Sequence, residues 1–108
     1  MTKIINLTPH DINIISEAEN RTFPASGSIA RVSQSFSDAE PVDGVPCQKQ
    51  ELGKPEGLPE PEDGTYYIVS SFVASAAGDR NDLLVPNTGR AIRDEKGHII
   101  GVPGFIRP

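Results

Sequence analysis

Apolar residues in this chain come in short runs that alternate with polar residues and are separated by breaks rich in proline and glycine. Lys3 to Leu7 is rich in β-forming residues, and Asp11 to Ile15 alternates polar and apolar residues for most of its length. A period of two residues is typical of a strand with one buried face. Pro9 lacks a backbone N–H, so we expect the first strand to bend or stop there. Further strands at 21–23 and from 28 to about 34 complete an expected antiparallel meander.

The middle of the chain, from Ser35 to Asp63, has the weakest pattern. It holds five prolines and three glycines, and only Val45 to Leu52 is credible as a strand. Residues 53–63 are so rich in proline, glycine and glutamate that both a helix and a central strand are disfavoured. We interpret 53–63 as a solvated connecting loop, with a lid over a ligand site as the alternative.

The clearest pattern lies in the last third of the chain. Thr65 to Ser70 predicts a central strand because it is β-rich and carries no charge. Ser70 or Ser71 can cap a short helix that covers 72–77 and ends at Gly78. A strand at 82–86 then allows a short parallel crossover, and a final hairpin over 91–102 turns at Lys96 and Gly97.

These elements predict one domain over residues 1–108 of the mainly β (α+β) class. We expect a compact antiparallel sheet or a small barrel, with one short helix after the strand at 65–70. Only 36% of the residues are apolar. A core this modest often gains stability from self-association, so we expect a homo-oligomer.

Charge and cysteine content narrow the classes of function. Residues 1–79 carry five basic and twelve acidic side chains, whereas 80–108 carry five basic and three acidic ones. An acidic chain is a poor binder of duplex nucleic acid, but a small anion near the arginines is allowed. The single cysteine, Cys47, has no basic neighbour in sequence, and no Cys/His spacing fits zinc. We expect no metal, no cofactor, no membrane association and a cytoplasmic location.

The strand ending at Ser70 and Ser71 is the first candidate site. Its two hydroxyls can hydrogen-bond a phosphate or carboxylate, and the alternative is that one of them is only a helix cap.

Arginines make the second candidate site. Arg80 lies in the run 78–82, and Arg90 and Arg93 follow the next strand. The planar guanidinium suits a phosphate or carboxylate and can stack on a base. The two loops flank opposite ends of one strand, so the arginines converge only if another element or subunit closes the gap. Surface ion pairs, such as Arg80 with Asp82, are the alternative.

The third candidate site brackets Pro9 and comprises Asn6, Thr8 and His10. Polar side chains at such a break can be aimed at a ligand, and His10 beside Asp11 invites comparison with a general-base pair. Neighbouring residues on a strand point to opposite faces, however. A local turn held by side-chain hydrogen bonds is the alternative.

Four segments of the chain resemble one group of proteins: Ile5-Asn6-Leu7-Thr8-Pro9-His10, Gly57-Leu58-Pro59-Glu60-Pro61, Tyr67-Ile68-Val69-Ser70, and the run from Arg93 to Val102. The group consists of small, uncharacterised proteins of phages, prophages and bacterial genomes. The resemblance implies a phage-related protein of the host-cell cytoplasm, acting as an accessory factor against host defence. It carries no catalytic residues over to this chain.

Together these observations favour a non-enzymatic protein that binds a small anionic, nucleotide-like ligand. In the phage context it would be a sponge that sequesters an immune signalling nucleotide. Phe72, Tyr66 and Tyr67 are candidates to stack on a base. One alternative is a small hydrolase that uses His10 as its base. The other is a protein–protein module, either an inhibitor of a host enzyme or a virion-associated protein.

Overall fold

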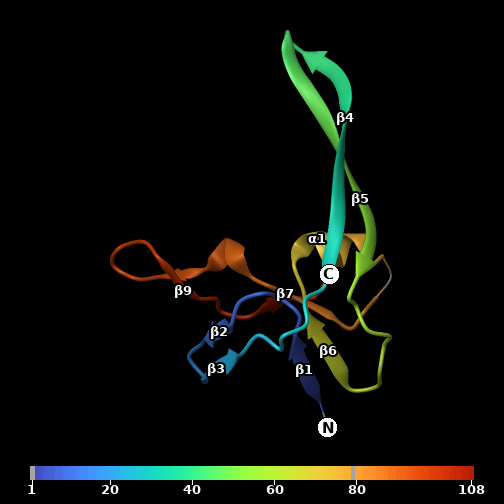
Figure 1. The fold of residues 1–108 in the computed structure, drawn as a ribbon. Helices are drawn as coiled ribbons and strands as arrows, with labels where there is room; N and C mark the ends of the chain where they lie inside the picture. The colour runs from blue at the N-terminus through green and yellow to red at the C-terminus, as the bar shows by residue number, and fades with distance from the viewer. Residues whose placement is uncertain (1, 79) are drawn as a thin grey trace.

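The structure, a computed structural model, describes residues 2–78 and 80–108. Its centre is a four-stranded sheet in the order β1-β6-β7-β10 (Figure 1). The strands are β1 (Lys3–Asn6), β6 (Thr65–Ile68), β7 (Leu83–Pro86) and β10 (Phe105–Ile106). The first three run parallel, and β10 pairs antiparallel with β7. The sheet is therefore mixed and open, which differs from the expected antiparallel sheet or barrel.

The hydrophobic core forms where β6 and β7 meet the helix α1 (Ser71–Ala76). Ile68, Val69 and Val73 are almost completely buried, as is Leu83. β6 lies between two neighbours and carries no charge, as a strand buried on both faces requires. The predicted central strand, short helix and parallel crossover are confirmed.

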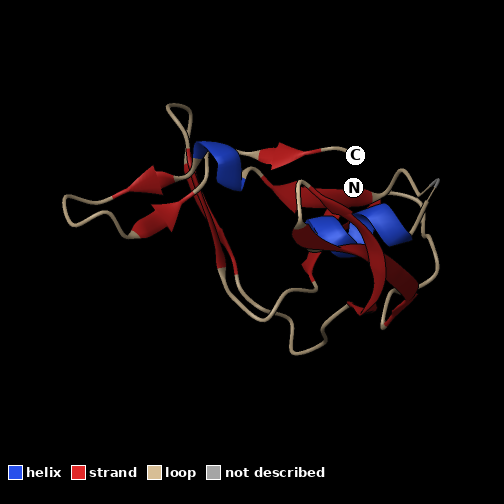
Figure 2. Cartoon of the chain, turned by 90° about the horizontal axis from the view of Figure 1, so that it is seen from above, coloured by secondary structure: helices blue, strands red, loops and turns tan. Residues whose placement is uncertain are grey.

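Two short hairpins extend sideways from the sheet and form a unit that we call the wing (Figures 1 and 2). They are β2 (Ile12–Ile15) with β3 (Asn20–Phe23), and β8 (Ile92–Arg93) with β9 (Ile99–Gly101). The 3-10 helix η1 (Thr88–Arg90) leads from β7 into the wing. A bridge between Ile14 and Val102 joins the two hairpins. The predicted turn at Lys96 and Gly97 is confirmed, and Gly97 has the positive φ of 85° that such turns require.

The longest element is a hairpin that projects from the rest of the molecule, which we call the arm (Figure 1). It consists of β4 (Arg31–Val42) and β5 (Val45–Glu56), joined at Asp43 and Gly44, whose φ angles of 49° and 76° match a two-residue hairpin turn. Its base packs against α1, and the remainder extends outward. The radius of gyration is 16.5 Å, whereas a compact domain of this length has about 13 Å. The molecule is therefore not compact.

The arm corrects the interpretation of residues 35–63 as mostly loop. Two 12-residue strands cover 31–42 and 45–56, so only 57–64 remains irregular between β5 and β6. The meander prediction is wrong as well, because β4 pairs with β5 and not with β3. Both faces of the arm are largely exposed, so no buried face imposes a period of two on the sequence. Pro41 and Pro55 are tolerated because each strand of the arm is an edge.

The mainly β class with one short helix is confirmed. Within the described ranges, no helix is long and apolar enough to cross a membrane.

Candidate functional site

The polar groups around Pro9 form a closed local network. Asn6 is 2% exposed, and its Nδ2 donates hydrogen bonds to the carbonyl oxygens of His10 (2.7 Å) and Phe23 (2.8 Å). Its Oδ1 accepts from the backbone N–H (2.9 Å) and the hydroxyl (2.7 Å) of Thr8. These four bonds use the full capacity of the amide. Asn6 and Thr8 therefore hold the turn, as the alternative interpretation of this motif predicts.

His10 contributes its backbone to this turn, and its side chain is exposed. Asp11 faces elsewhere, since its Oδ1 accepts a hydrogen bond from the N–H of Ala25 at 2.9 Å. Among the described residues, His10 forms no ion pair with a carboxylate. The described residues of one copy therefore do not assemble the geometry needed for a His10 general base held by an acidic partner.

Ser70 caps the helix α1. Its hydroxyl oxygen accepts a hydrogen bond from the N–H of Val73 at 3.2 Å, and its extended backbone is typical of an N-cap. Ser71 is the first helical residue and is exposed. The cap role of Ser70 matches the alternative interpretation of the first candidate site.

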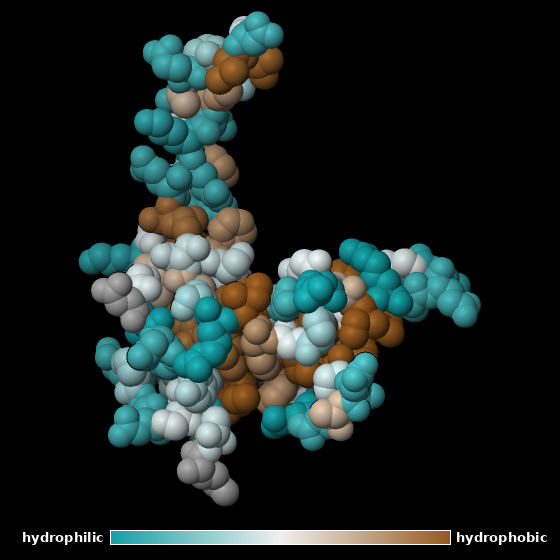
Figure 3. All heavy atoms as spheres, turned by 180° about the vertical axis from the view of Figure 1, so that it is seen from behind, coloured by the Kyte–Doolittle hydropathy of each residue, from teal (hydrophilic) through white to brown (hydrophobic). Residues whose placement is uncertain are grey.

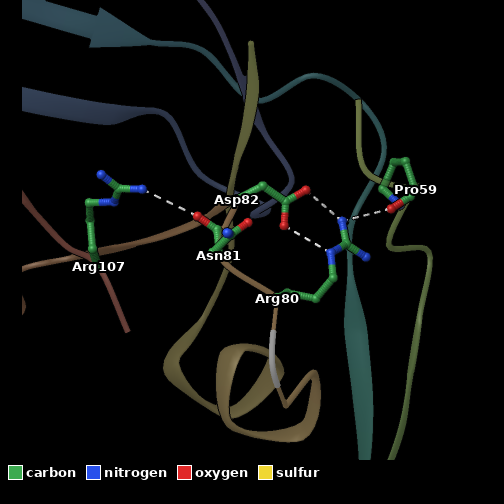
Figure 4. Close-up of polar contacts among 5 residues, drawn as sticks. All are labelled: Pro59, Arg80, Asn81, Asp82 and Arg107. Atoms are coloured by element: carbon green, nitrogen blue, oxygen red, sulfur yellow. Dashed lines mark hydrogen bonds and ion pairs between the residues drawn. The ribbon is translucent and has the colours of Figure 1, made fainter. Parts of the chain in front are cut away.

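Arg80 is held by Asp82 at the start of β7 (Figure 4). Its Nε and one terminal nitrogen donate to the two carboxylate oxygens at 2.8 and 2.7 Å, and the same terminal nitrogen also donates to the carbonyl of Pro59. The hydrogen bonds from Arg80 lower the pKa of Asp82 against the opposing effect of burial, and they raise the pKa of Arg80. Arg80 thus joins the 57–63 segment to β7. Asp79, in the same predicted run, lies outside the described residues.

Arg90 and Arg93 lie beyond the other end of β7, in η1 and β8. Both are exposed, and Arg93 donates a hydrogen bond to the carbonyl of Gly97 at 2.8 Å. Within the described ranges, the guanidinium of Arg90 makes no hydrogen bond or ion pair. None of the main cavities is lined by two of the three predicted arginines. The structure therefore separates Arg80 from Arg90 and Arg93.

A mainly apolar hollow of about 190 Å³ lies between the wing and the end of β7, and we call it the wing groove. Its lining comes from β2, the end of β7, η1 and β9: Asp11, Ile12, Asn13, Pro86, Thr88, Ile99, Ile100, Gly101 and Val102. Ile99 and Ile100 are 52% and 43% exposed. Arg93 is paired with Ile99 across the β8–β9 ladder, and Arg90 follows Thr88 by two residues in η1. The groove thus has mainly apolar walls, and two arginines are backbone neighbours of its lining residues without lining it themselves.

Sequence reasoning proposed the arginines but missed the groove. Its walls come from residues as far apart as Ile12 and Val102, which no local pattern connects. It also missed Arg107, whose guanidinium lies 5.3 Å from the ring centre of Tyr66 and donates to the carbonyl of Asn81 at 3.3 Å (Figure 4). Of the proposed stacking residues, Tyr67 is 2% exposed and belongs to the core, whereas Phe72 is 44% exposed.

The far end of the arm is the second exposed apolar feature. Val42 and Val45 face each other across the turn and are 67% and 60% exposed, and Phe36 is 60% exposed farther down the arm. Figure 3 shows hydrophobic side chains gathered at the tip, above a stretch of mostly hydrophilic ones. Exposed apolar groups of this kind are typical of a surface that meets a partner.

The fold and these surfaces define a mainly β protein with a projecting arm and a mainly apolar groove in the wing. Comparison of the chain with protein-family models, characterised proteins and solved structures finds no match.

Proposed function

We propose that this chain is a non-enzymatic binding protein that holds a small anionic, nucleotide-like ligand and works as a homo-oligomer. One observation carries the proposal: the wing groove offers an apolar wall to a base, and the exposed Arg90 and Arg93 are backbone neighbours of its lining residues, Arg90 near Thr88 in η1 and Arg93 opposite Ile99 in the β8–β9 ladder. Arginine binds phosphate through charge-assisted, often bidentate hydrogen bonds. Apolar walls with a few convergent polar groups are typical of small-molecule sites.

The size of the groove supports a second copy as part of the site. Ligand pockets usually enclose about 300–1,000 Å³, and the wing groove has about 190 Å³. A base fits this space better than a whole nucleotide does, so the rest of the ligand would stay in solvent unless another subunit covers it.

The surface area of the chain supports oligomerisation independently. A compact monomer of 11.6 kDa exposes about 5,800 Å², whereas this chain exposes 7753 Å². A typical stable interface buries about 800 Å² on each partner. Most residues of both arm strands are exposed, and a two-stranded hairpin without a packed face is marginally stable in water. A second copy that covers the arm would remove this cost.

In the phage context, the protein would sequester an immune signalling nucleotide in the host cytoplasm without cleaving it. The resemblance of four segments to phage proteins supports this role. A module that binds a different protein through the arm is the other candidate, and it is supported by the same exposed residues at the tip.

Titration calorimetry of the full-length protein with cyclic mononucleotides, cyclic dinucleotides and linear nucleotides tests the proposal. Binding should be lost or weakened by at least about tenfold in the double variant Arg90→Ala/Arg93→Ala, since each charge-assisted hydrogen bond contributes about 1.5–3 kcal/mol. Lys96→Ala is the matched control, because it removes one positive charge from the same hairpin outside the groove.

Recovery of intact nucleotide after heat denaturation supports sequestration, whereas a converted product would indicate an enzyme. If no nucleotide binds, or if the double variant binds as tightly as the original chain, the ligand proposal is wrong. Light scattering on the same sample reports the oligomeric state separately.

A further inference from the structure

We infer that two copies join through the outer edge of β4, so that the arms of a dimer form one four-stranded antiparallel sheet. In this sheet the two β4 strands are the central pair, and the two β5 strands are the outer ones. The inference rests on the homo-oligomer of the proposed function and names its interface.

The two edges of the arm are protected unequally. An unpaired strand edge attracts another strand, and proteins block such edges with prolines and lysines. β5 carries four of these blocking residues: Pro46, Lys49, Lys54 and Pro55. β4 carries no lysine, and its one proline, Pro41, lies beside the turn. The edge of β4 is therefore the one left open to a partner strand.

A second copy is the partner that this edge fits best. Most residues of β4 are exposed in one copy, and the edge of β4 presents the same open strand in every copy. Pairing of two identical edges around a twofold axis is closed and self-complementary, so it ends at a dimer and does not propagate. The two β5 edges then lie on the outside, where their prolines and lysines prevent further addition.

The register follows from the regular part of β4. The β4–β5 ladder shifts between Val32 and Gln34 and again between Ala39 and Val42, so the uninterrupted stretch is 34–39. In an antiparallel pair, alternate residues turn their N–H and C=O groups to the same side. When a twofold axis relates the two strands, the residue at the axis faces the same residue of the second copy. Phe36 lies within the uninterrupted stretch, with regular ladder residues on both sides.

When the twofold axis passes between the two Phe36 residues, the ring of Phe36 packs against the ring of Phe36 from the second copy. Gln34 then lies opposite Asp38, and Ser35 lies opposite Ser37. The exposed aromatic ring, 60% accessible in one copy, becomes a cross-strand aromatic pair. The serines on the opposite face are small enough to let the two hairpins approach.

A cysteine cross-link tests this arrangement on the full-length chain. Phe36→Cys is made in a Cys47→Ser background, since Cys47 is the only native cysteine. Facing residues of an antiparallel pair have Cα atoms about 4.5–5.5 Å apart, within the range for a disulfide. Under mild oxidation we expect most of the protein to become a covalent dimer on a non-reducing gel.

Gln50→Cys in the same background is the matched control. Gln50 is exposed and lies opposite Phe36 in the β4–β5 ladder, but it belongs to β5. In the proposed sheet, the two Gln50 positions are three strand spacings apart, about 14 Å. We expect this variant to cross-link at least tenfold less than Phe36→Cys. Circular dichroism checks that both variants keep the fold.

The outcomes separate this inference from the proposed function. A disulfide through Gln50 and not through Phe36 would overturn the inference in favour of the β5 edge. An oligomer by light scattering that cross-links at neither position would also overturn it, and the homo-oligomer itself would stand. A monomer at all concentrations would refute this inference and the homo-oligomer of the proposed function. Nucleotide binding by that monomer would leave the ligand proposal intact.

Discussion

Arg80 and Asp82 make an ion pair whose side chains are only 20% and 10% exposed. Removing one member of a buried pair leaves the other charge without its partner, which costs about 3–5 kcal/mol. We expect Arg80→Ala to lower the free energy of unfolding by about 3 kcal/mol in urea titration at fixed protein concentration. It should leave the affinity for nucleotides unchanged. Arg90→Ala, the control, should change stability by less than about 0.5 kcal/mol because Arg90 is exposed. A stable Arg80→Ala variant that loses nucleotide would place Arg80 in the ligand site.

For two of the candidate site residues, the sequence left open a structural role and a binding role. Asn6 and Ser70 were each predicted with two roles, and in the structure each is engaged in a structural contact. A hydrogen bond such as the one from Asn6 to Phe23 joins residues 17 positions apart, so the local pattern could not decide between the roles. Arg90 and Arg93 remain candidates for the proposed ligand, because both are exposed and neither is tied into the core.

The helix α1 has six residues, a length at which a helix depends on its ends and on packing. The hydroxyl of Ser70 satisfies the N–H of Val73. We expect Ser70→Ala to lower the free energy of unfolding by about 1 kcal/mol, seen as a melting temperature about 5 °C lower. Ser71→Ala is the neighbouring control, since Ser71 is exposed and is not the cap; we expect almost no change. Equal effects of the two substitutions would contradict the assignment of Ser70 as the cap.

Elements with a buried face were predictable, and the arm was not. β6 and α1 bury Ile68 and Val73, and this burial leaves an apolar pattern in the sequence. In the distal arm, Ser35, Ser37 and Lys49 occupy strand positions with solvent on both faces. Nothing in one copy selects apolar residues there, so the segment has the composition of a loop. In the proposed dimer, β4 gains its second neighbouring strand from another copy. The sequence of β4 alone indicates that neighbour only weakly.

At the scale of the whole molecule, the body and the distal arm are separable. The core cluster of Leu7, Ala30, Tyr67, Val69, Val73, Ala74 and Leu83 lies in the body, and Val32, near the base of the arm, is the one arm residue among the described hydrophobic residues packed against it. Shortening the arm should therefore remove the dimer and keep the fold. A suitable variant replaces residues 36–50 by Asn-Gly, because Ser35 and Glu51 already face each other across the ladder and Asn-Gly favours a two-residue turn.

The melting temperature of a homo-oligomer rises with protein concentration, because association stabilises the folded state by mass action. For the native chain we expect such a rise between about 5 and 500 µM, together with a dimeric mass by light scattering. The shortened variant should have a monomeric mass and a melting temperature independent of concentration. Near-ultraviolet circular dichroism from Tyr67, which is buried in the body, should be retained.

A shortened chain that stays dimeric would move the interface to the body or the wing. A shortened chain that unfolds would mean that residues 36–50 stabilise the body, within one copy or from a second copy.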